Sequence, residues 1–196
     1  MTGTLKKLSS EIQAQVRKEL LPQYISQWRK KNETHLFSFT GASMLPFLRA
    51  GDSIQVLFSD SGDIEIGDIV FITTDETVIA HRIIDIKQKD NTQMFLEMGD
   101  NGLTPHLISS DQIAGKVMMY QRDRQFISST SPPARKLNQA IARVQRGILS
   151  VRDRCPPVPG RDFLLMRVRY LILFVVIARL TKQNPASNEN LEGRTF

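Results

Sequence analysis

The sequence predicts a mainly β protein, in which a small β domain is flanked by helical segments. Six short segments rich in β-branched and aromatic residues follow one another: HLFSFTG, DSIQVLF, DIVFITT, TVIAHRIIDI, QMFLEMG and QIAGKVMMY. Gly-Asp pairs, which favour turns, begin at Gly51, Gly62, Gly67 and Gly99. Strands and helices do not alternate, so we expect six to eight strands and no parallel α/β sheet.

The N-terminal segment, residues 1–34, is expected to be helical. Apolar residues recur there at intervals of three or four, which is the period of an amphipathic helix: Leu5, Leu8, Ile12, Val16 and Leu20. Pro22 interrupts this pattern, and Tyr24, Ile25 and Trp28 continue it. We expect Trp28 to pack in a core. Charged residues occur throughout the first thirty positions, so we expect no signal peptide or membrane anchor there.

The C-terminal third contains two further helical patterns. After the β domain of residues 35–130, the stretch SPPAR at 131–135 is typical of a linker. Residues 134–154 then form a basic amphipathic pattern whose apolar face holds Leu137, Ile141, Val144, Ile148 and Val151. CPPVPG ends this helix, and an apolar segment follows. We therefore expect a basic, apolar helical extension over 131–183 and a disordered tail over 184–196.

The positive charge of the chain is confined to its C-terminal third. Residues 1–120 hold 12 Lys and Arg and 15 Asp and Glu, whereas residues 121–196 hold 14 and 5, for a net charge of +6. A basic segment favours an anionic membrane surface, a nucleic acid or an acidic protein as its partner. Because the β domain is mildly acidic, we expect no nucleic acid as a substrate.

Ser43 and His81 are the candidate nucleophile and base. A serine hydroxyl is a weak nucleophile until a neighbouring base removes its proton. Ser43 lies in TGASMLPFLRAGD, between a strand-like segment and a Gly-Asp turn, where its own amide N–H could face a developing oxyanion. The other two histidines, His35 and His106, lie in no such context and are expected to be structural or surface residues. The sequence indicates no metal site and no phosphate-binding loop, so we expect no cofactor.

Four motifs in a fixed order carry a family resemblance. TGASMLPFLRAGDSIQV is followed by IEIGDIVFI, VIAHRIID and FLEMGDNG, over about eighty residues. This series resembles the signal peptidase I family, in the branch that uses Ser and His. The resemblance implies a signal-peptidase or LexA-like β catalytic fold, with Ser43 as nucleophile and His81 as general base. Asp100 then matches an acid that orients His81, although Gly-Asp-Asn-Gly is also a good turn sequence.

The chain departs from that family at three places. Some members have a serine at the position of Gly41, whose hydroxyl helps to bind the oxyanion. The eukaryotic branch often has a second acidic residue shortly after the position of Asp100, where this chain reads GLTPH. We also expect no N-terminal membrane span of the kind that the family carries. These departures leave the third member of a triad open.

The resemblance implies a serine endopeptidase that cleaves a precursor or leader peptide after small residues. Two alternatives remain open. One is a non-catalytic module of the same fold that binds an extended peptide by β-addition. The other is a self-cleaving LexA-like regulator, although such regulators use a lysine base and carry a DNA-binding helix-turn-helix.

The segment Phe163–Leu180 raises the question of a membrane. It approaches the roughly 20 apolar residues of a span, but Arg167 and Arg169 interrupt it. A short span, a helix in the interface of an anionic membrane, and a helix docked on the protein or on a second copy all remain open. We expect a membrane-associated protein. If the segment spans, the arginines on its N-terminal side would keep the catalytic domain in the cytoplasm, with a cytoplasmic precursor as substrate.

Overall fold

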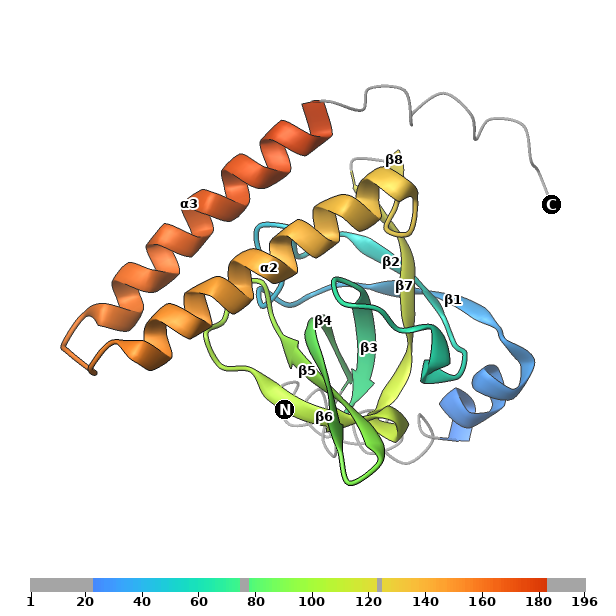
Figure 1. The fold of residues 1–196 in the computed structure, drawn as a ribbon. Helices are drawn as coiled ribbons and strands as arrows, with labels where there is room; N and C mark the ends of the chain where they lie inside the picture. The colour runs from blue at the N-terminus through green and yellow to red at the C-terminus, as the bar shows by residue number, and fades with distance from the viewer. Residues whose placement is uncertain (1–22, 75–77, 123–124, 183–196) are drawn as a thin grey trace, which may run out of the picture.

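The computed structural model describes residues 23–74, 78–122 and 125–182 (Figure 1). The amphipathic pattern expected over Leu5–Leu20 and the tail expected over 184–196 lie outside the described residues. Within the described ranges the protein is mainly β, as the sequence predicts, with eight strands in one antiparallel sheet and helices at both ends.

Each of the six predicted strand segments forms a strand, and two short strands add to them. The bounds are β1 Thr34–Ser38, β2 Ser53–Leu57, β3 Ile69–Thr73, β4 Val78–Lys89, β5 Thr92–Met98, β6 His106–Ser109, β7 Ile113–Arg122 and β8 Gln125–Ser128. Single turns of 3₁₀-helix, Ser61–Asp63 and Ser110–Gln112, precede β3 and β7. The β-branched and aromatic residues that predicted the strands supply their buried sides.

The strands follow the spatial order β1-β2-β7-β3-β4-β5-β6, and β8 pairs with β7. The pairing of β4 with β5 matters most for the site, because Arg82 lies opposite Met98. Paired residues of an antiparallel sheet point to the same face, and their chain neighbours point to the other. This register therefore separates the face of Arg82 and Met98 from the face of His81 and Glu97.

The N-terminal helix over residues 23–31 packs against the first strands. Trp28 lies 4.1 Å from His35 and 4.9 Å from Phe58, measured between ring centroids. Ile25 is buried in the main core beside the same strands. The prediction that Trp28 packs in a core is thus confirmed.

Helix α2, Pro132–Arg154, is part of the folded body rather than a separate extension. It crosses the sheet (Figure 1), and Leu137 and Ile141 are buried in the main core. Of the predicted apolar face, only Val151 is exposed. The stretch SPPAR is not a linker, because α2 begins at Pro132. Proline is tolerated in the first helical turn, where its missing N–H would have no partner within the helix.

Helix α3, Arg161–Lys182, runs back along the side of α2 that faces away from the sheet (Figure 1). Leu173 and Arg169 are fully buried on its inner side. Two nitrogens of Arg169, Nε and one Nη, have no hydrogen-bond partner among the described residues. Burial lowers the pKa of the Arg169 guanidinium, which the Asp100 carboxylate partly opposes. No helix in the described part of the chain is long and apolar enough to cross a membrane.

Candidate active site

Ser43 begins a tight turn that follows β1 and is anchored in the core. Met44, Phe47 and Leu48 are buried, so the turn has little freedom to move. On its other side, the Asn101 N–H donates a 2.7 Å hydrogen bond to the Ser43 carbonyl oxygen. The Asn101 side-chain amide also donates to the carbonyl of Ala42, at 3.3 Å. The Gly-Asp-Asn turn after β5 therefore holds the serine turn in place.

Gly99 lies next to both Ser43 and His81. A methyl group built on Gly99 would lie 3.1 Å from His81 Nε2 and 3.2 Å from Ser43 Cβ. Both side chains therefore border the same small space, and His81 turns its Nε2 atom toward the serine turn. Among the described residues, Ser43 Oγ makes no hydrogen bond. Free enzymes often show the nucleophile and base slightly apart, and the hydrogen bond tightens when substrate binds.

Glu97, which was not among the site residues predicted from the sequence, lies behind His81. Its Oε2 atom is 2.6 Å from His81 Nδ1, and its carboxylate is almost fully buried. An ionised carboxylate only accepts hydrogen bonds, so Nδ1 is the protonated nitrogen of His81. The lone pair of Nε2 is thereby left toward Ser43. Serine, histidine and carboxylate follow one another in the order that a charge-stabilised catalytic base requires.

The second oxygen of Glu97 is also occupied. His106, at the start of β6, approaches Glu97 Oε1 with its Nδ1 atom at 2.9 Å. The imidazole of His106 is largely exposed, with 61% of its side-chain surface accessible. The carboxylate of Glu97 is thus held by two histidines from opposite sides, which fixes its orientation toward His81.

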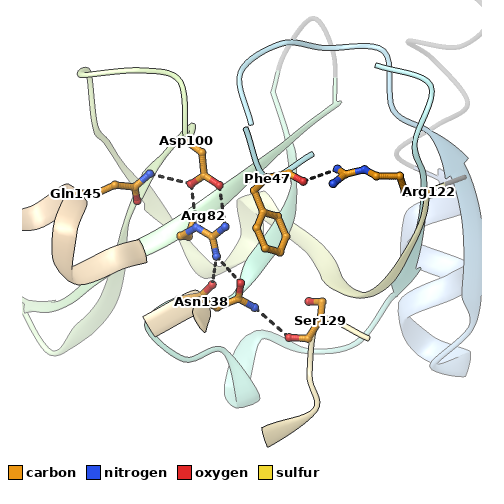
Figure 2. A network of polar contacts seen from close by, with 8 residues as sticks. Phe47, Arg82, Asp100, Arg122, Ser129, Asn138 and Gln145 are labelled. Carbon is orange, nitrogen blue, oxygen red and sulfur yellow. Dashed lines mark hydrogen bonds and ion pairs between the residues drawn. The ribbon is translucent and has the colours of Figure 1, made fainter. Parts of the chain in front are cut away.

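Asp100 does not lie at His81, contrary to the orienting role that we expected from the sequence. Both of its oxygens accept hydrogen bonds from the buried Arg82, at 2.8 and 2.7 Å, and Gln145 of α2 adds a third at 2.8 Å (Figure 2). The reason is the strand register. Asp100 is two residues after Met98, which pairs with Arg82, so it points to the face opposite His81 and Glu97.

Arg82 connects this face of the sheet to α2. One of its Nη atoms donates to the Gly67 carbonyl and to Asn138 Oδ1, both at 2.9 Å, and its guanidinium lies over the Phe47 ring (Figure 2). The neighbours of Arg82 and Asp100 in the chain are His81 and Gly99. The buried pair therefore helps to set the position of His81 and Gly99 without contacting the side chain of Ser43 or His81.

The Ser43 N–H donates no hydrogen bond among the described residues. Gly41 leaves the approach to Ser43 Oγ uncrowded, since a methyl group there would be 3.9 Å away. His35, by contrast, packs against the Trp28 ring and forms a 3.0 Å hydrogen bond with Glu33, which lowers the pKa of Glu33. His35 is therefore structural, as expected.

A comparison with models of known protein families finds no match for this chain, and a comparison with curated protein sequences finds no significantly similar protein.

The space at Gly99 predicts a strong effect of a single added methyl group. In Gly99→Ala the new carbon would lie 2.7 Å from the Ser43 carbonyl oxygen, closer than such atoms approach. We expect the free energy of unfolding to fall by about 1–3 kcal/mol, because the backbone must shift. Urea denaturation measures this change.

Gly102→Ala is the matched control, because its new methyl group would have only an ordinary contact at 3.7 Å. It should change the free energy of unfolding by no more than about 0.5 kcal/mol. Equal stabilities of the two variants would contradict the packing of Gly99 against the Ser43 turn.

Proposed function

We propose that the protein is a serine endopeptidase with Ser43 as nucleophile, His81 as general base and Glu97 as the carboxylate that orients the base. The observation that carries this proposal is the 2.6 Å contact of Glu97 with His81 Nδ1, with Nε2 on the side of Ser43. A structural histidine does not need a buried carboxylate on one nitrogen and a serine turn beside the other. This arrangement matches the roles of a catalytic triad.

The geometry supports a two-step acyl transfer. His81 Nε2 accepts the proton of Ser43 Oγ as the oxygen attacks the carbonyl carbon of the peptide bond. Negative charge develops on the carbonyl oxygen, which the Ser43 N–H binds, while Glu97 stabilises the imidazolium. The C–N bond then breaks as His81 protonates the leaving amine. A water molecule, deprotonated by His81, then attacks the acyl-serine ester. The bond between the acyl carbon and Ser43 Oγ breaks, His81 returns the proton to Oγ, and the second product leaves as a carboxylic acid.

Within this class we propose an enzyme resembling the Ser-His branch of signal peptidase I, which cleaves a precursor or leader peptide. The four ordered motifs support the proposal, as does the antiparallel β body that carries them. In this proposal Glu97 is the third member of the triad, which the sequence left open. It supplies the carboxylate to His81, so no second acidic residue after Asp100 is needed.

The alternative of a non-catalytic peptide-binding module loses its main support. Its best support was the missing second acidic residue after Asp100, and Glu97 supplies His81 with a carboxylate at hydrogen-bonding distance. A LexA-like regulator would use a lysine base. Lys116 is the one buried lysine among the described residues, and it binds Asp68 at 2.6 Å instead.

The test is cleavage of a proteome-derived peptide library by the purified full-length protein, with new peptide termini read by mass spectrometry. Wild type should produce a consistent set of new termini, and Ser43→Ala and His81→Ala should not. Ser150→Ala removes an exposed serine of α2 and serves as the matched control, with the wild-type pattern expected. Cleavage that persists in Ser43→Ala, or no cleavage by wild type with anionic vesicles present, would count against the proposal.

A further inference from the structure

The outer side of α3 is apolar and exposed. We define the outer face as Phe163, Leu164, Val168, Leu171, Phe174 and Val175. Leu164, Val168, Leu171 and Val175 follow at intervals of three and four residues and so share one side of the helix. Leu171 is 69% exposed, and Phe163, Leu164 and Phe174 are 59–62% exposed. A contiguous apolar face of this kind on a folded protein marks an interaction surface.

This face is not needed to attach α3 to the protein. The opposite side of the helix already packs on α2, with Arg169 and Leu173 buried and Val176 partly buried. Figure 1 shows α2 between α3 and the sheet, so the outer face of α3 points away from the folded body. The helix therefore has two apolar sides, of which the protein itself covers one.

The charge of the helical pair identifies the partner. Residues 132–182 hold 11 Lys and Arg but only two acidic residues. Both acids are engaged by an adjacent arginine, Asp153 by Arg152 and Asp162 by Arg161, at 2.9 Å each. A second copy docked through the same face would bring two basic helical pairs together, which opposes association. An anionic lipid surface instead offers hydrocarbon to the apolar face and negative headgroups to the arginines.

Arg167 fits this environment although it lies on the apolar side. Its guanidinium sits over the Phe163 ring, 4.7 Å from the ring centroid. A long arginine side chain beside an interfacial aromatic ring extends along apolar surface and places its charge among the headgroups. We propose that α3 lies in the plane of an anionic membrane surface with its outer face buried in the interface. This inference needs neither Ser43 nor His81, so it is independent of the proposed peptidase activity.

The test is co-sedimentation of the full-length protein with vesicles of phosphatidylglycerol and phosphatidylcholine, compared with phosphatidylcholine alone. Wild type should bind the anionic vesicles, and high salt should weaken binding by screening. Leu171→Glu should weaken binding about tenfold or more, because it places a negative charge at the most exposed point of the face.

Leu36→Glu is the matched control, since it makes the same change at a 58% exposed leucine of β1. It should bind as wild type does. Fluorescence of Trp28, the single tryptophan, checks that each variant is folded. The proposal is overturned if wild type does not bind anionic vesicles, or if Leu171→Glu binds them as well as wild type does. It is also overturned if ultracentrifugation shows a lipid-free dimer that Leu171→Glu dissociates, because the face would then join two copies.

Discussion

Glu97→Gln is expected to lower kcat by about 10⁴-fold while the protein remains folded, by analogy with removal of the charge behind a catalytic histidine. The carboxylate accepts hydrogen bonds from His81 and His106 at the same time. A glutamine has only one acceptor end. If its NH₂ group faces His81, the proton moves to Nε2 and the base is lost. If its oxygen faces His81, the imidazolium loses the charge that stabilises it.

The comparison with His106→Gln separates the role of Glu97 from the role of its other partner. His106 contributes one hydrogen bond to Glu97 from an exposed position, and a bond of this kind contributes about 1 kcal/mol. We therefore expect kcat to fall no more than about tenfold in His106→Gln. Both variants are measured on one peptide that wild type cleaves. A Glu97→Gln enzyme with activity within tenfold of wild type would show that Glu97 is not the orienting carboxylate.

Arg82→Met is expected to lower the free energy of unfolding by about 3–5 kcal/mol, because it leaves the Asp100 carboxylate buried without its charge partner. Arg82 donates four hydrogen bonds within the protein, two of them to Asp100. The side chains of Arg82 and Asp100 are both fully buried. Urea denaturation followed by Trp28 fluorescence measures the change. Adding Asp100→Leu to Arg82→Met should restore much of the lost stability, since no unpaired buried charge then remains.

Arg169→Met provides the contrast at a second buried arginine. Two Arg169 nitrogens lack a partner among the described residues, and burial lowers the pKa of this guanidinium, so its charged form is costly in the folded state. Replacing it should leave the free energy of unfolding unchanged or raise it. If Arg169→Met lowers the free energy of unfolding as much as Arg82→Met does, the loss in Arg82→Met is not specific to breaking the Arg82–Asp100 pair.

The sequence by itself determined the β class and the six principal strands, and its motifs singled out Ser43 and His81 as candidates. Strand composition and Gly-Asp turns are local properties, and they are visible without knowledge of the fold. The basic amphipathic pattern of α2 was visible for the same reason. The exposed apolar side of α3 was not, because only the packing on α2 shows which side is covered.

Only the tertiary structure showed which carboxylate forms a hydrogen bond with His81. Glu97 and Asp100 lie three residues apart on either side of Met98 and Gly99, so alternation places them on opposite faces of the sheet. Whether His81 shares a face with Glu97 or with Asp100 depends on the pairing of Arg82 with Met98. If the register of β4 and β5 shifted by one residue, Asp100 would lie on the face of His81 and Glu97 on the opposite face. Such a register is set by long-range packing, including the contacts of Arg82 and Asp100 with α2, and local sequence does not encode it.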